Sequence, residues 1–213
     1  MTVADVIEYV RYGELANFGI IKNLSSEYPA EVIDAEKAII SYINLGLIEL
    51  YKRFNLRTEE TVVIMSENLA IYTLNIPTLN SIVGVYDEEG SEYVLNSEND
   101  ALSILTPSYN VIQVPNPSEG GALYVMYNAS PDKIEWNDDL TTLTVPIPPV
   151  LYEPLFKYIG YRGCTGMTKD TQTDVQLYYN SFLKSCDIAI QLGVVPTEDP
   201  LVSGTKLELK GFV

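Results

Sequence analysis

The sequence predicts an α+β fold: a helical bundle with an inserted antiparallel β-sandwich or barrel-like domain and an extended C-terminal tail. Helical spacing of apolar residues runs through residues 29–54 and returns after residue 150, and the segment between them breaks into short β-rich runs. Two helical blocks around a β segment most simply form one bundle with an insertion. We therefore expect a helical domain whose first part is 1–57, an acidic β domain at 58–148, a second helical part at 149–193 and a tail at 194–213.

The chain is expected to begin with a helix over residues 3–17. Thr2, with Asp5 three residues later, is a short form of the capping box, which satisfies free backbone N–H groups where a helix starts. Gly13 and Gly19 bracket the expected end of this helix. Residues 20–28 are expected to be a connector.

The longest helix is predicted at residues 29–54. Ile33, Ile40, Leu47 and Phe54 recur every seven residues, and a second apolar stripe beside them widens the apolar sector. The proline that opens this stretch suits the first turn of a helix. Because one helix cannot bury two faces alone, this helix needs helical partners elsewhere in the chain or in another subunit.

The middle of the chain is predicted to form short antiparallel strands. The acidic turn at 87–90 ends in glycine between two β-rich runs, which is typical of a hairpin. The expected strands are 61–65, 69–74, 81–86, 92–95, 103–105, 110–114, 122–128 and 141–145. Six to eight short strands with regular turns favour a small sandwich or barrel.

Acidic charge is concentrated in the same segment. Between Glu59 and Leu140 the sequence holds fourteen Asp and Glu residues and one basic residue, Lys133, in a chain of net charge −16. Because affinity for phosphates comes from Lys and Arg, this segment is not expected to wrap nucleic acid and would repel it.

Helical spacing returns after the proline-rich stretch 146–149. A helix is predicted at 150–162, a polar loop at 163–171, and a last helix at 174–192 that Gly193 ends as a C′ glycine. The tail that follows contains a short apolar alternation, Lys-Leu-Glu-Leu-Lys at 206–210, which has no obvious core to join within its own subunit.

The composition excludes several chemistries. The sequence has no histidine, so Ser-His-Asp and Cys-His arrangements are impossible within this chain. We predict no catalytic residue, no cofactor and no metal site. Cys164 and Cys186 are expected to be two buried, reduced thiols, and a disulfide between them is the alternative. No apolar run is long enough to span a membrane, and the N-terminal residues lack the pattern of a secretory signal.

The order of the elements resembles a known family. A helix ending in Tyr161-Arg162, a polar loop to Thr173, and a closing helix with Tyr178-Tyr179-Asn180 follow the strand ALYVMYNASP at 122–131 and its proline-rich return. This arrangement resembles the head-to-tail adaptor proteins of short-tailed bacteriophages, the tubular tail protein A group. The resemblance covers most of the chain as architecture.

The resemblance implies a structural virion protein without catalysis. Its expected partners are copies of itself in a ring, typically of twelve, the portal protein above it and the tail nozzle protein below it. Phage DNA would pass through without specific binding, and no membrane is involved. The protein would be assembled in the host cytoplasm and lie at the neck of the virion.

Two sets of residues are candidates for the contacts of such an adaptor. Docking to the portal or to a neighbouring subunit is predicted for apolar residues of the tail: Leu201, Val202, Leu207, Leu209 and Phe212. The acidic side chains predicted to face the channel are Asp87, Glu88, Glu89 and Asp100.

Two other functions stay open at this point. A carbohydrate- or receptor-binding phage tail module with a helical attachment domain would use aromatic side chains for stacking, and the candidates are Tyr72, Tyr86, Tyr93, Tyr109, Tyr124, Tyr127 and Trp136. An acid-base enzyme that uses carboxylates is the third and least favoured possibility.

Overall fold

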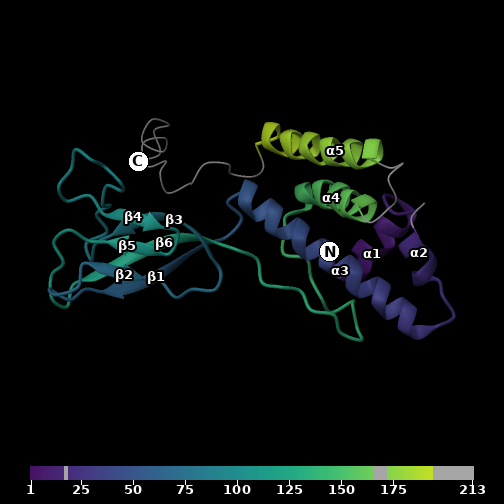
Figure 1. Cartoon of the computed structure of the whole chain (residues 1–213), viewed down its shortest axis with the longest axis horizontal. Helices are drawn as coiled ribbons and strands as arrows, with labels where there is room; N and C mark the ends of the chain where they lie inside the picture. The colour runs from purple at the N-terminus through teal and green to yellow at the C-terminus, as the bar shows by residue number, and fades with distance from the viewer. Residues whose placement is uncertain (17–18, 166–171, 194–213) are drawn as a thin grey trace, which may run out of the picture. The chain divides into compact units, whose positions relative to one another are not determined.

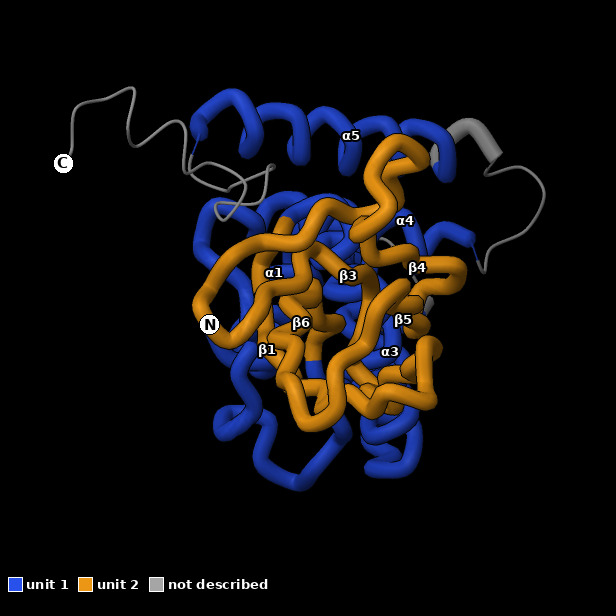
Figure 2. The backbone as a smooth tube through the Cα atoms, turned by 90° about the vertical axis from the view of Figure 1, so that its left-hand side faces the viewer, with its two compact units in different colours: residues 1–54, 132–197 blue, residues 55–131, 198–213 orange. Residues whose placement is uncertain are grey.

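The computed structural model describes residues 1–16, 19–165 and 172–193, and it is a mixed α+β protein (Figure 1). The chain divides into two compact units. The helical unit joins residues 1–54 to the described chain from residue 132 onward, and the β unit is residues 55–131 (Figure 2). The predicted tail at 194–213 lies outside the described residues.

The helices all belong to the helical unit. They are α1 (Val3–Tyr12), α2 (Gly19–Leu24), α3 (Pro29–Arg53), the 3-10 turn η1 (Pro149–Leu151), α4 (Tyr152–Thr165) and α5 (Gln172–Gln191). The capping box at the start of α1 is present, because Thr2 Oγ1 accepts from Asp5 N and Asp5 Oδ2 accepts from Thr2 N. However, α1 ends at Tyr12 rather than residue 17, and α2 occupies part of the expected connector.

The long helix α3 is the centre of the helical core. Its side chains Ile39, Ile43, Leu47 and Leu50 are fully buried. Helix α4 packs against both α3 and α5 (Figure 1). Gly46 permits the close approach of α4, since a Cβ atom there would lie 2.6 Å from Leu155 Cδ1. Each fully buried aliphatic side chain in this core contributes about 1.5–3 kcal/mol of transfer free energy.

Residues 132–148 belong to the helical unit and not to the β domain, so the boundary lies at residue 131 rather than at 148. The strand expected at 141–145 is wrong: these residues form a turn and one isolated bridge, between Thr144 and Thr2. Val3 N donates to Leu143 O at 2.8 Å and Val145 N to Met1 O at 3.0 Å. The β-branched residues of this stretch thus pair with the start of the chain, which no local pattern could indicate.

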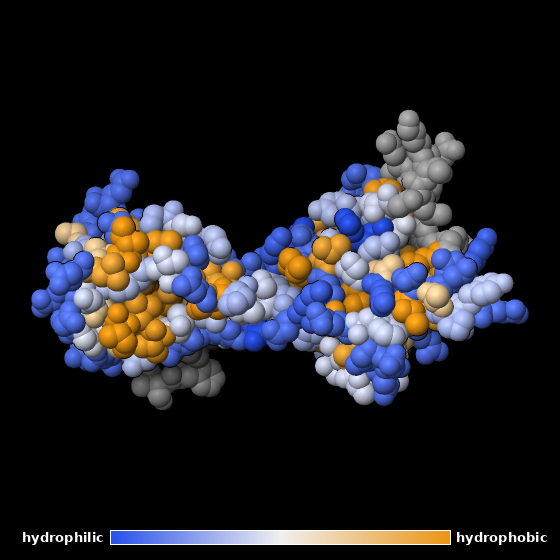
Figure 3. Space-filling view, turned by 60° about the horizontal axis from the view of Figure 1, so that its bottom comes forward, coloured by the Kyte–Doolittle hydropathy of each residue, from blue (hydrophilic) through white to orange (hydrophobic). Residues whose placement is uncertain are grey.

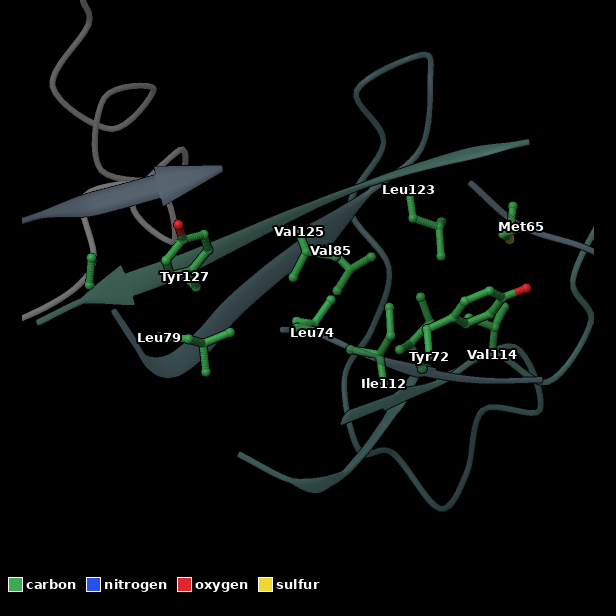
Figure 4. Close-up of a cluster of buried hydrophobic side chains, with 12 residues drawn as sticks. Met65, Tyr72, Leu74, Leu79, Val85, Ile112, Val114, Leu123, Val125 and Tyr127 are labelled. Carbon is green, nitrogen blue, oxygen red and sulfur yellow. The ribbon is translucent and has the colours of Figure 1, made fainter. Parts of the chain in front are cut away.

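The described part of the β unit contains two three-stranded antiparallel sheets and no closed barrel. The strands are β1 (Thr58–Ile64), β2 (Ile71–Thr73), β3 (Leu79–Tyr86), β4 (Leu105–Ser108), β5 (Val111–Gln113) and β6 (Ala122–Ala129). One sheet has the order β1-β6-β3 and the other has the order β2-β5-β4. Both sheets supply side chains to one apolar core, which includes Val125 from β6, Tyr72 from β2 and Ile112 from β5 (Figure 4).

The strand boundaries differ from expectation where pairing overrides local composition. β1 begins at Thr58 rather than 61, because Thr58 and Glu59 pair with Asn128 and Tyr127 of β6. The return strand expected at 92–95 is absent, although Tyr93 N donates to Val85 O at 2.8 Å. The strand expected at 103–105 is replaced by β4, which begins at Leu105.

Candidate functional site

The described residues hold no clustered metal ligands. In the part of the chain that the structure describes, no group of three or more Asp, Glu and Cys side chains could hold a metal ion. Among the same residues, no helix is both long and apolar enough to cross a membrane.

The four predicted channel-facing acids lie in two separate turns of the β unit. Asp87 Oδ1 accepts from Glu89 N at 2.9 Å and from Ser91 N at 2.8 Å, so this carboxylate organises the turn after β3. Glu88 Oε1 accepts from Ala122 N at 2.7 Å. Asp100 Oδ1 accepts from Leu102 N at 2.9 Å in the second turn. Asp87 and Asp100 thus hold backbone within their own turns, Glu88 holds the first residue of β6, and the side chain of Glu89 is exposed.

Leu201, Val202, Leu207, Leu209 and Phe212 all lie outside the described residues.

The aromatic candidates for carbohydrate stacking divide by location. Tyr72 and Tyr127 are buried in the core of the β unit, and Trp136 belongs to the helical unit. Tyr86 of β3 and Tyr124 of β6 are directly paired across the sheet, so their rings lie on one face. Tyr109 is 66% exposed in the turn between β4 and β5. The structure therefore brings together two of the seven candidates on a shared sheet face.

The sheet face that carries these two tyrosines is apolar and turned away from the core. Side chains alternate along strands, and Leu123, Val125 and Tyr127 of β6 point into the core, which turns their neighbours outward. On β1 the outward residues include Val62, 48% exposed, and Ile64, 62% exposed. We define the outer face by its outward residues Glu60, Val62, Ile64, Tyr86, Ala122, Tyr124 and Met126.

Hydrophobic side chains gather visibly on the surface of the β unit (Figure 3). Val62 pairs with Tyr124, which pairs with Tyr86, so one row of large apolar side chains crosses all three strands. Contiguous exposed apolar surface of this kind marks interaction sites more often than scattered single residues do. Sequence reasoning missed this face, although the unbroken apolar run Val62-Val63-Ile64, which puts apolar side chains on both faces of a strand, could have indicated it.

β1 is also an edge of its sheet. Ala129 N donates to Arg57 O at 2.9 Å and Met65 N donates to Gly121 O at 2.7 Å. Arg57 and Met65 are therefore at hydrogen-bonded positions. Because hydrogen-bonded and non-hydrogen-bonded pairs alternate in an antiparallel ladder, the backbone groups of residues 59, 61 and 63 also bond to β6. The N–H and C=O groups of Glu60, Val62 and Ile64 therefore point away from β6, toward the edge.

The inward side of β1 carries a small polar cluster. Tyr127 Oη donates to Glu59 Oε2 at 2.7 Å, and Arg57 Nε donates to Glu59 Oε1 at 2.7 Å. The hydrogen bond from Tyr127, followed by that from Arg57, lowers the pKa of the Glu59 carboxyl, and burial raises the pKa of the Tyr127 hydroxyl. A carboxylate with a lowered pKa is a weak base at neutral pH, so this cluster suits structure better than acid-base catalysis.

Two of the residues that carried the family resemblance, Tyr161 and Tyr179, belong to an aromatic cluster of the helical unit. Phe182 of α5 is fully buried, with its ring centroid 5.2 Å from that of Tyr158 on α4. The ring centroids of Tyr161 and Tyr179 are 5.1 Å apart, and the Arg53 guanidinium of α3 lies 5.2 Å from the ring centroid of Phe182. This cluster fastens α5 to α3 and α4, which accounts for its aromatic content by packing.

A groove of about 760 Å³ runs beside α3. Its lining includes Ile40 and Ile48 of α3 and the segment from Lys133 to Trp136. Trp136 Nε1 donates to Glu36 Oε2 at 2.9 Å, and Lys37 Nζ lies 5.1 Å from the Trp136 centroid. These contacts close one wall of the groove but leave no convergent set of polar atoms that would define a small ligand.

Comparison with known proteins assigns no family: no protein-family model matches this chain, and no curated protein matches it either.

Proposed function

We propose that this protein is a structural virion component, a head-to-tail adaptor that assembles as a ring between a portal and a tail nozzle and lets DNA pass. In this proposal the helices of the helical unit form a bundle, and the two sheets of the β unit form a sandwich. The ring would contain about twelve copies, as in the family that the sequence resembles.

The observation that carries the proposal is apolar surface that the described chain leaves uncovered on both units. On the β unit it is the outer face. On the helical unit, Ile188 of α5 and Leu192, the residue that follows the helix, lie one turn apart and are 47% and 62% exposed. Side chains of this kind on two units are expected where heterologous contacts between copies close into a ring.

Charge is consistent with passage of DNA. The chain carries a net charge of −16, and residues 55–131 contain ten carboxylates against a single basic residue, Arg57. A channel lined by like charge repels the phosphate backbone, so DNA would not adhere to it in transit. The exposed Glu89 and its neighbour Glu88 are the best placed of the predicted acids for this role.

The direct test is the mass of the purified protein alone and with a portal protein. We expect a monomer that becomes a ring of about twelve copies only on the portal. A protein that stays monomeric in both conditions and does not bind the portal would overturn the proposal.

The channel role has its own test. Glu88→Lys with Glu89→Lys reverses two exposed charges, and we expect slower genome exit from virions that carry them. The matched control is Asp87→Asn with Asp100→Asn, which keeps the oxygen acceptors that hold both turns. Unchanged ejection by the lysine variant would remove these two residues from the channel.

A second function, binding of a carbohydrate or receptor, is favoured by one observation, the pairing of Tyr86 with Tyr124 on the outer face. Adjacent aromatic rings on a flat sheet offer a stacking surface for sugars. If this is the function, Tyr124→Ala abolishes glycan binding by the isolated protein and leaves its folding intact. Loss of portal binding by the same variant, with glycan binding unchanged, would assign the face to assembly instead.

A further inference from the structure

β1 has the longest strand edge that lacks backbone partners among the described residues. β1 has seven residues, and the backbone groups of Glu60, Val62 and Ile64 point toward the edge, with no backbone partner among the described residues. Proteins normally protect such edges with proline, bulges, lysine or covering segments, because an open edge recruits another strand. β1 has no proline, no lysine and no register shift in its pairing with β6, and its charged side chains are Glu60 on the outer face and Glu59, which Arg57 and Tyr127 hold on the inward side.

The opposite edge of the same sheet shows the usual protection. β3 has two register shifts against β6, at Leu79/Ser81 and at Ile82/Gly84. The loop that follows β3 covers its free edge: Glu92 forms an isolated antiparallel β-bridge with Tyr86, and Tyr93 N donates to Val85 O. The difference between the two edges indicates that β1 is left open for a partner strand.

The chain itself contains a segment with the properties of that partner. Residues 205–211 read Thr-Lys-Leu-Glu-Leu-Lys-Gly, with Leu207 and Leu209 at a period of two. A strand with this alternation beside β1 would place both leucines on one face, where they would extend the apolar row of Val62 and Ile64. Lys206 and Lys210 would approach a unit in which ten carboxylates face one arginine.

The segment is also long enough to leave its own subunit. Eleven residues, 194–204, separate Gly193, two residues beyond the end of α5, from Thr205, and they include Pro196 and Pro200. Fully extended, eleven residues span about 36–40 Å, and proline favours such extended backbone. A connection of that length can cross to an adjacent copy in a ring.

We propose that residues 205–211 of one copy add to the β1 edge of a neighbouring copy as a fourth strand of its β1-β6-β3 sheet. Main-chain hydrogen bonds to Glu60, Val62 and Ile64 supply the attachment, and the leucine alternation selects the register. This pairing rests on the ring proposed above and names the surfaces that join its subunits.

Hydrogen exchange in the assembled ring tests the pairing residue by residue. The amides of Glu60, Val62 and Ile64 are expected to exchange about tenfold or more slowly in the full chain than in a chain ending at residue 204. The amides of Thr61 and Val63 are internal controls, since they bond to β6 with or without the added strand. Equal exchange of the three edge amides in both chains overturns the pairing.

Cross-linking distinguishes a neighbour's segment from the chain's own. Rings are assembled from an equal mixture of Val62→Cys and Leu209→Cys chains. A second mixture, of Glu60→Cys and Leu207→Cys chains, tests another pair of positions on the two strands. A disulfide-linked species at twice the 23.7 kDa chain mass supports exchange between copies. The comparison is a single chain that carries both substitutions. A disulfide that forms within that chain, but not between singly substituted chains, would show that the segment folds back on its own β1, which overturns the proposal.

Ring size, measured in the same samples, separates the two proposals. Rings that assemble without edge protection or cross-links retain the adaptor function and refute the strand addition. Failure to assemble on any portal refutes the function and the pairing together. The matched control for the cross-links is Ser108→Cys on β4, a strand of the other sheet, which is expected to give no link with Leu209→Cys.

Discussion

Asn44 makes a contact that should decide whether the return segment 132–148 folds with the helices. From α3, Asn44 Nδ2 donates to Ile134 O at 2.8 Å, and Ile134 N donates to Asn44 Oδ1 at 2.9 Å. The side-chain amide thus imitates the pair of bonds that a neighbouring strand would supply. Asn44→Ala removes both bonds and leaves the backbone N–H and C=O of a buried residue, Ile134, without these partners.

The expected loss follows from the two bonds. Each hydrogen bond contributes about 1 kcal/mol net, and an unpaired group in a partly buried site costs more, so Asn44→Ala should lower the free energy of unfolding by about 2–3 kcal/mol. The matched control is Ser41→Ala, an exposed position one turn earlier beside the same groove. A surface change of that kind should stay within about 0.5 kcal/mol.

The sequence contains one tryptophan, Trp136, which lies two residues beyond Ile134 and reports on the same segment. Urea unfolding is followed by its fluorescence. With a urea dependence of about 1–3 kcal/mol per molar, the midpoint of Asn44→Ala should fall by about 1 M or more, whereas that of Ser41→Ala should not move. Equal midpoints for Asn44→Ala and the parent protein would refute the assignment of this segment to the helical unit.

Three further measurements test the packing and the electrostatics. Phe182→Ala should cost about 3–5 kcal/mol in thermal or urea unfolding because the ring is fully buried, and a loss below about 1 kcal/mol would contradict its position in the aromatic cluster. Tyr127→Phe removes the bond that lowers the pKa of Glu59, so it should destabilise the protein above the ordinary glutamate pKa, with the difference from the parent shrinking as the pH falls through the lowered value. Burial raises the pKa of the Cys186 thiol to about 11, so both Cys186 and the buried Cys164 should resist a thiol reagent at pH 8 and react as two thiols per chain in denaturant. No thiols after unfolding would indicate a disulfide.

The candidate surfaces were only partly accessible from sequence. The acids of the turn after β3 were predicted as a group, and they do lie in an exposed turn, but Asp87 and Glu88 hold backbone N–H groups that no spacing rule pointed to. The outer face and the open edge of β1 were missed. Both features depend on which face of β1 carries the side chain of Val62. The pairing of Val62 with Tyr124, some sixty residues away in the sequence, determines that face.

Local signals fixed the elements whose determinants lie within a few residues. The sequence alone predicts the capping box at Thr2, the proline that opens α3 at residue 29, and Gly193 with φ +63 after α5, because each acts on backbone within one helical turn. Tertiary structure decided what those signals could not. The stretch 141–145 has the composition of a strand yet pairs only at Thr144, with the start of the chain. Strand identity is a property of two segments together, so distant partners, and not propensity, determined which β-rich runs became sheet and which surfaces stayed open.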